Sequence, residues 1–346
     1  MKWAVNASGE NNAGAETPAG ANRRFSFARG GVLQQLLAFA SLILLVIVFS
    51  FSSDNFFVFD NIMGILLSTA VIGVLALGST FVIVTGGIDL AVGTVMTFSS
   101  VMTGVIITFW GAPIPLGIIG GIATGAFCGF LSGVAVAKMK IPPFIVTLAM
   151  MMITKGLSLI ISGTKPIYFT DGRASGFKDI SMASVTHSLF GIEIPNAVLI
   201  FFGLAIVAGL LLTKTIVGRY TFALGSNEEA TRLSGVKVDF WKIVVYTITG
   251  VFSGIAGILM ASRLNTAHPA LGAGYELEAI AAVVIGGTSL SGGQGTILGT
   301  VIGALITSVL TNGLRILSVP QEWQTVIIGL VLVGAVYADI LRRRKA

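Results

Sequence analysis

Apolar residues in this chain form long runs that short polar segments separate. A helix needs about 20 apolar residues to cross the hydrocarbon core of a bilayer, and runs of this length predict about ten membrane-spanning helices. The fold class expected is therefore an all-α polytopic membrane protein. The predicted spans cover residues 32–52, 62–85, 94–110, 115–137, 143–162, 196–213, 243–262, 276–292, 295–313 and 323–341.

Residues 1–30 differ from the rest of the chain. They are rich in Ala, Asn and Gly and show no apolar periodicity, so they bury too little surface to become ordered, and we expect a disordered tail. The apolar run that follows is longer than the hydrophobic region of a signal peptide and lacks an obvious small-residue cleavage site. The expected division is a cytoplasmic tail, 1–30, and a membrane domain, 31–346.

Positive charges lie in a few short loops and near the two ends of the chain. Cytoplasmic loops of membrane proteins are enriched in Lys and Arg, and with ten spans every basic cluster falls on one side. We therefore expect both termini in the cytoplasm and the segment 163–195 as the main extracytoplasmic loop. The clusters are Arg23, Arg24 and Arg29; Lys138 and Lys140; Lys214, Arg219, Arg232, Lys237 and Lys242; and residues 342–345.

The composition and the missing motifs argue against nucleic-acid binding, catalysis and metal binding. The net charge is +6, but only 10% of the residues are charged, 54% are hydrophobic and the mean hydropathy is +0.93. The basic residues form no face interleaved with aromatic ones, so we expect membrane lipid and no nucleic acid as a partner. No GxxxxGK[ST] loop occurs, His187 and His268 stand apart, and Cys128 is a lone packing residue, so we expect no catalytic residue, cofactor or metal.

Glycine interrupts two predicted spans, near residues 80–95 and 285–298, where partial or re-entrant helices would fit. The segments GGIDLAVG at 86–93 and GGTSLSGG at 286–293 match at four positions with an offset of 200 residues. An internal duplication and chance both account for this match. Each segment lies near the cytoplasmic end of a predicted span, which makes its glycines gate candidates: Gly86, Gly87, Gly286, Gly287, Gly292 and Gly293.

Few ionisable residues lie within the predicted spans. Asp89 stands directly before an apolar run, so its carboxylate can cap the next helix, with a direct role in transport as the alternative. Lys155 lies about two turns from the outer end of its span, which favours snorkelling to the interface over lining the pathway. Glu276 and Glu278 favour a solvated helix start.

The span 115–137 carries glycine at every fourth position. Each step of four residues turns an α-helix by about 400°, so the glycine track advances about 40° per step and winds around the helix. We expect it to pack against more than one neighbour. The glycines are Gly117, Gly121, Gly125, Gly129 and Gly133.

The segment 218–242 is the longest polar stretch on the predicted cytoplasmic side. Ser226 or Asn227 can cap a helix there, Glu228 and Glu229 fall in its first turn, and Gly235 can end it. The pattern predicts a short surface helix.

This segment resembles the coupling loop of ABC importer permeases, whose pattern is Glu-Ala-Ala, three residues and Gly. Here it reads Glu229, Ala230, Thr231 and Gly235, with Thr in place of one Ala. Together with GGIDLAVG (86–93), IPPFIVTLAMMM (141–152) and YELEAIAAVVIGGTSLSGGQGTILGTVIGALI (275–306), the loop is similar to the ribose, xylose and galactose-type sugar permeases. The resemblance covers nearly everything after the tail.

The resemblance implies a vitamin-B12-importer-like (type II) permease of a bacterial inner membrane that carries a monosaccharide or related polyol. Its implied partners are cytoplasmic ABC ATPase subunits, an extracytoplasmic sugar-binding protein and a second permease subunit. The loop 214–242 would couple the ATPase to transport, with the following residues at the contact: Asn227, Glu228, Glu229, Ala230 and Gly235. Alternatives are a stand-alone secondary transporter or channel, a membrane scaffold, and a branched-chain amino-acid permease.

Overall fold

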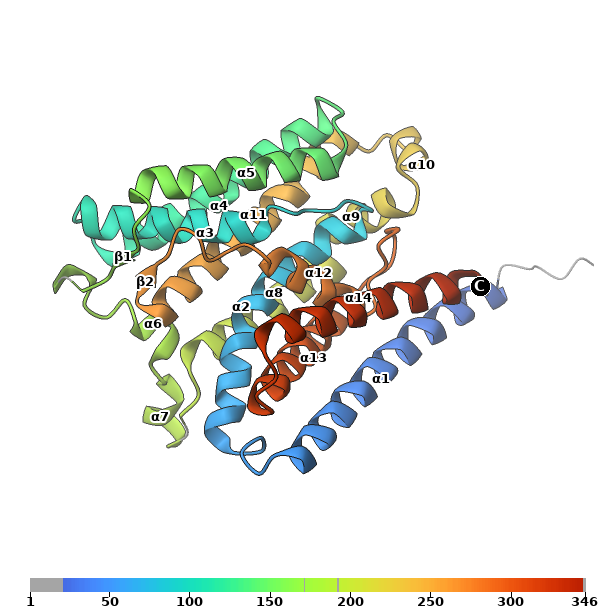
Figure 1. Ribbon diagram of the computed structural model, residues 1–346. Coiled ribbons are helices and arrows are strands. Elements are labelled where there is room, and N and C mark those ends of the chain that lie inside the picture. The colour runs from blue at the N-terminus through green and yellow to red at the C-terminus, as the bar shows by residue number, and fades with distance from the viewer. Residues whose placement is uncertain (1–20, 171, 192, 345–346) are drawn as a thin grey trace, which may run out of the picture.

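A computed structural model describes residues 21–344 of the chain, except 171 and 192. Its elements are helices apart from one short strand pair (Figure 1). The elements in chain order are α1 (Ala21–Ser52), α2 (Phe59–Val84), α3 (Val92–Gly104), a π-helical turn (Val105–Phe109), α4 (Ile114–Ala137), α5 (Pro143–Ser162), β1 (Ile167–Tyr168), a 3-10 turn (Gly172–Ala174), α6 (Asp179–Met182), α7 (Val185–Phe190), α8 (Asn196–Lys214), α9 (Ile216–Ser226), α10 (Glu228–Leu233), α11 (Val238–Leu264), β2 (Thr266–Ala267), α12 (Tyr275–Ile285), α13 (Ile297–Ile316) and α14 (Gln321–Arg344).

Eight of the described helices are long and apolar enough to span a membrane, with α3 and the π-helical turn counted as one. These helices confirm the polytopic all-α class. The span predicted over 276–292 is only partly helical: α12 has 11 residues and ends at Ile285, at the glycine break where a partial helix would fit. In α14 the apolar part of the described residues is Gln321–Tyr337, which is shorter than a full span. The number of ten spans stays a prediction.

Helix α1 begins at Ala21, so helical structure extends into the part of the chain where we expect a tail. Residues 1–20 lie outside the described residues.

The long helices run between two ends of the molecule (Figure 1). One end, which we call the α10 end, carries α10, the start of α1 and the end of α14. The opposite end, which we call the β end, carries the strand pair, α6 and α7. At the α10 end an ion pair of 2.7 Å joins Lys140 to Asp239, so the basic segments around 138–140 and 214–242 lie together. Two of the four basic clusters expected on one side therefore lie next to each other.

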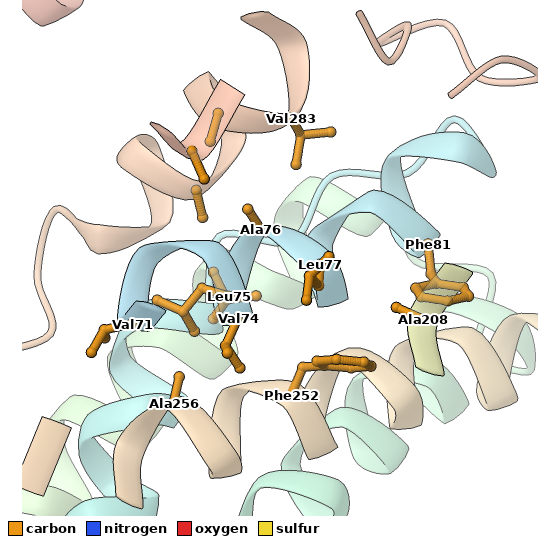
Figure 2. Close-up of a cluster of buried hydrophobic side chains, with 14 of the residues drawn as sticks. Val71, Val74, Leu75, Ala76, Leu77, Phe81, Ala208, Phe252, Ala256 and Val283 are labelled. Atoms are coloured by element: carbon orange, nitrogen blue, oxygen red, sulfur yellow. The ribbon is translucent and has the colours of Figure 1, made fainter. Parts of the chain in front are cut away.

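Helix α2 forms the centre of the membrane domain. Every residue from Thr69 to Val84 is buried, as expected for a helix that is apolar on all sides. Figure 2 shows its side chains facing α11 at Phe252 and Ala256 and α12 at Val283. The rings of Phe81 and Phe252 stack with centroids 6.3 Å apart. Because α2 ends at a glycine break, any shift of that break acts on the centre of the fold.

The glycine track of α4 packs against two neighbours, as the spacing predicts, and all five of its glycines are buried. A β-carbon at Gly121 would overlap the hydroxyl of Thr103 on α3, whereas one at Gly125 would overlap the carbonyl oxygen of Gly250 on α11. The first half of α4 therefore packs on α3 and the second half on α11. Helices approach this closely because the glycines of α4 carry no side chain at the contact.

The segment 163–195 is attached to the β end of α11. Strand β1 pairs antiparallel with β2, with Ile167 opposite Ala267. The hydroxyl of Ser262 on α11 donates to the Phe177 carbonyl at 2.7 Å and accepts the Ser181 N–H at 3.0 Å. These contacts fix the loop to the residues that lead into α12.

Candidate functional site

Helix α10 begins at the predicted capping motif. The side-chain oxygen of Asn227 accepts the N–H of Ala230 at 2.9 Å, so Asn227 rather than Ser226 is the cap. Glu228 and Glu229 lie in the first turn, where carboxylates interact favourably with the helix dipole. The predicted surface helix is confirmed.

The helix ends at Gly235, as its sequence predicts. Gly235 has a φ of +81°, and its N–H donates to the Arg232 carbonyl at 3.0 Å. The N–H of Val236 donates to the Thr231 carbonyl at 3.4 Å, which completes a Schellman ending. A residue with a β-carbon adopts this left-handed conformation only at a cost of about 1 kcal/mol, so glycine has a defined role here.

A chain of ion pairs holds α10 against the membrane domain. The carboxylate of Glu228 accepts hydrogen bonds from Lys242 at 2.6 Å and from Arg232 at 3.1 Å. Arg232 also lies 3.6 Å from Asp239, which pairs with Lys140. Partial burial opposes ionisation of Glu228, but the hydrogen bonds and charges of Lys242 and Arg232 outweigh it and lower its pKa. Each exposed ion pair alone contributes little to the stability of the fold. Together the pairs form a network that fixes the position of α10.

The outer face of α10 is open to a partner. Glu229, Ala230 and Leu233 are exposed, and Leu233 exposes 81% of its surface. Spacings of three and four residues place the three side chains on one face. The sequence motif did not single out Leu233, because an apolar residue in a short helix is normally assigned to the core.

An open hollow of about 410 Å³ continues this face between α9 and the start of α11. Tyr220 and Trp241 line it with their rings 4.9 Å apart, and Phe240 is next to them. Backbone and side-chain atoms of residues 234–237 close the side next to α10. The exposed face and the hollow together form a surface that is concave and partly aromatic.

The two predicted glycine breaks end their helices in the same way. Gly86 and Gly287 have positive φ values of +78° and +94°. Each donates its N–H to the carbonyl three residues earlier, at 2.9 Å in both cases. The next residue, Gly87 or Thr288, donates to the carbonyl five residues earlier at 3.1 Å. Both are Schellman endings. Gly86 is therefore structurally equivalent to Gly287, whereas the sequence match aligned it with Gly286, one position earlier.

The two breaks also meet each other and the last turn of α9, in a contact that we call the glycine junction: Val84, Gly86, Gly225, Gly292 and Gly293. The Gly293 N–H donates to the Val84 carbonyl at 2.9 Å. A β-carbon at Gly225 would overlap the Val84 carbonyl oxygen, and one at Gly292 would lie 2.8 Å from the Gly86 nitrogen. Gly225 stands directly before Ser226 and the cap of α10. The junction therefore connects α10 with the end of α2 and with the loop between α12 and α13.

The junction includes only some of the gate candidates. Gly86, Gly292 and Gly293 belong to it. Gly87 instead packs on the hydroxyl of Tyr246, and Gly286 on the backbone of α13. No sequence pattern singled out Gly225, because its partners lie far away along the chain.

Asp89 is buried with 7% of its surface exposed. Its carboxylate accepts the Ala91 N–H at 2.8 Å, whereas α3 starts at Val92. The carboxylate therefore bonds the residue before α3, and does not cap an N–H of the first turn as the favoured interpretation expects.

Comparison with known proteins supplies the family. A family described as "Branched-chain amino acid transport system / permease component" matches residues 61–336. The chain is 40% identical to the ribose import permease protein RbsC of Haemophilus influenzae over 92% of this chain and 97% of that protein. The same protein of Bacillus subtilis is 41% identical over 91% of this chain and 95% of its own length.

Further relatives are named as import permeases for other sugars. The fructose import permease protein FrcC of Rhizobium meliloti is 38% identical over 82% of this chain and 78% of its own length. The chain has no significant match among solved structures. The match over most of the membrane domain and these identities show the family: the chain belongs to the permease subunits of ABC importers, among the sugar import permeases.

Proposed function

We propose that this chain is the membrane-spanning subunit of an importer for a monosaccharide or related polyol, with α10 as its coupling helix. The observation that carries this proposal is the glycine junction, which connects α10 to the end of α2 and to the loop after α12 through backbone contacts. A separate cytoplasmic subunit supplies ATP hydrolysis. An extracytoplasmic binding protein and a second permease subunit complete the importer.

The ATPase docks on the exposed face of α10 and the aromatic hollow beside it. Leu233 supplies an apolar contact that gains free energy only when a partner covers it. Asn227, Glu229, Ala230 and Gly235 surround this contact or shape its backbone, while Glu228 anchors the helix from the other side.

Movement of α10 passes into the membrane through two connections. The ion pairs of Glu228 move the start of α11, and the glycine junction moves the breaks that end α2 and α12. Packed backbones resist compression, so they transmit displacement as rigid bodies and do not absorb it. The membrane domain then alternates between outward and inward access.

We place the α10 end in the cytoplasm of a bacterial cell, together with both termini, because the basic segments lie there. Names of the relatives support a sugar as cargo, whereas the family description supports a branched-chain amino acid as the second candidate.

Uptake into proteoliposomes separates these possibilities. Liposomes that hold the complete importer are expected to take up labelled ribose only when ATP is present on the α10 side. Uptake of labelled leucine in place of ribose would support the second candidate. Ribose uptake by this chain alone, driven by an ion gradient, would contradict the proposal.

A further inference from the structure

After α11 the chain returns across the membrane through residues 268–285, and only α12 makes part of this crossing as a helix. Strand β2 lies at the β end, whereas α12 finishes at the opposite end near the glycine junction (Figure 1). The 11 residues of α12 extend about 17 Å, against a hydrocarbon core of about 30 Å. Residues 268–274 therefore pass through the remaining depth without helical structure.

This non-helical segment carries polar backbone groups that need a solvent. Among the residues that the structure describes, the carbonyl oxygens of residues 269–273 accept no hydrogen bond. Ala270 and Ala273 are exposed, so the segment is not sealed inside this chain. Lipid does not tolerate such backbone, which occurs at membrane depth only where protein buries it or water reaches it.

A small crevice of about 10 Å³, the size of one water molecule, lies where this segment passes α3 and α5. Gly272 packs so closely on α3 that a β-carbon there would overlap the Gly93 carbonyl oxygen. We call the following set the crevice wall: Thr94, Thr97, Lys155, Pro269, Ala270, Gly272 and Ala273.

Lys155 is the charged group of the crevice wall. It lies within α5, is exposed on this chain, and has no ion pair or hydrogen bond with any described residue. The preceding residue, Thr154, is buried and donates to the hydroxyl of Thr94 at 2.9 Å, so α5 turns a polar side toward α3. Charged residues inside membrane spans face protein or water, and an exposed one indicates a wetted face.

We propose that the crevice wall lines the aqueous pathway of the solute, on a face that a second permease subunit closes. The Lys155 ammonium donates to solute oxygens, and the carbonyls of the exposed residues Ala270 and Ala273 accept from solute hydroxyls. A polyol can satisfy both kinds of group, whereas an aliphatic side chain satisfies neither. The inference rests on the proposed function and adds the location and chemistry of the solute contact.

Cysteine labelling of the assembled importer tests whether the wall is wetted. Lys155→Cys and Ala273→Cys are expected to react with a charged, membrane-impermeant methanethiosulfonate, and saturating ribose is expected to slow the reaction. Ile206→Cys is the matched control, because Ile206 lies in mid-α8, exposes 66% of its surface and should face lipid. Labelling is read on this chain, and the importer without these substitutions is the blank, since the chain's single cysteine, Cys128, is buried.

Uptake measurements test the contact itself. Lys155→Met is expected to lower ribose uptake about tenfold, since a hydrogen bond to a charged group is lost, while ATP hydrolysis continues. Lys155→Arg should restore most of the uptake because it keeps the charge and the donors.

Three results would overturn the inference. They are labelling no faster than that of Ile206→Cys, labelling that ribose does not slow, and full uptake by Lys155→Met. The first result would instead support the interpretation in which the Lys155 side chain snorkels to the membrane interface. None of these results contradicts the proposed function as long as the unsubstituted importer takes up ribose with ATP. Absence of that uptake would contradict the proposed function, while the labelling would still report whether water reaches the wall.

Discussion

At the scale of single residues, glycine has two distinct uses in this protein. At Gly86, Gly235 and Gly287 it supplies the positive φ that ends a helix. At Gly225 the reason is space, because the Val84 carbonyl occupies the position of a β-carbon. Only the second use depends on a partner distant in sequence.

Gly225→Ala is expected to separate α9 from the end of α2, because the added methyl group meets backbone that cannot move aside. We predict that ATP-dependent uptake falls at least about tenfold, while ATP hydrolysis by the assembled importer persists. Gly209→Ala is the control, since no atom lies within 4 Å of that position. Equal uptake by both variants, at equal amounts in the membrane, would disprove the mechanical role of the junction.

A disulfide across the junction gives the complementary result. A β-carbon at Gly293 would lie 3.3 Å from the Ser226 α-carbon, so cysteines at these two positions are close enough to be joined, although a cysteine at Gly293 has to adopt a positive φ of +74°. If the junction moves as one body, the oxidised Ser226→Cys, Gly293→Cys variant should transport as well as its reduced form. Transport that returns only on reduction would mean that the junction opens during the cycle.

At the scale of elements, α10 has an anchored side and a free side. Glu228 bonds Lys242 on α11, whereas Leu233 has no cover on this chain. A paired change of Glu228 and Glu229 would therefore mix two effects, loss of the anchor and change of the docking face.

Leu233→Ser isolates the docking face. Burial of a leucine side chain contributes about 1.5–3 kcal/mol, so the ATPase should bind the variant at least about tenfold more weakly. Leu317→Ser serves as the control. Leu317 is also an exposed leucine, but it lies at the far end of α13, where no ATPase reaches. Equilibrium binding of the isolated ATPase to the permease in nanodiscs measures both, and equal affinities would exclude α10 as the contact.

The contact between α4 and α11 should be equally sensitive to an added methyl group. Gly125→Ala meets the Gly250 carbonyl, and we expect a loss of about 1–3 kcal/mol in the free energy of unfolding. Thermal unfolding in detergent measures this loss. Gly203→Ala on α8, which has no atom within 4 Å, should leave the midpoint unchanged.

At the scale of the whole molecule, the proposed orientation predicts which end of the protein a reagent outside the cell can reach. Ser175, which precedes α6, and Ser234, which follows α10, are both exposed, and these two helices lie at opposite ends of the molecule. In intact cells an impermeant thiol reagent should modify Ser175→Cys at once and Ser234→Cys only after the membrane is permeabilised. The reverse order would place the basic segments outside and reject the orientation.

Local patterns made much of this protein predictable from its sequence. Asn227 and Gly235 act within one turn of backbone, so the pattern predicted both ends of α10. The span expected over 276–292 was too long, because α12 ends at Ile285 and the glycine pair after it, with Gly287 at positive φ, stops the helix. Gly225 and Lys155 depend on contacts between distant segments, which no local pattern contains.

The two partners of the α4 glycine track also have a consequence for biosynthesis. Helix α3 precedes α4, but about a hundred residues separate the end of α4 from the start of α11. At a typical translation rate of about 5–20 residues per second, the second half of the track waits roughly 5–20 s for its partner. Lipid tails solvate a bare glycine surface without a hydrophobic penalty, so α4 can remain in the bilayer unpaired until α11 emerges from the ribosome.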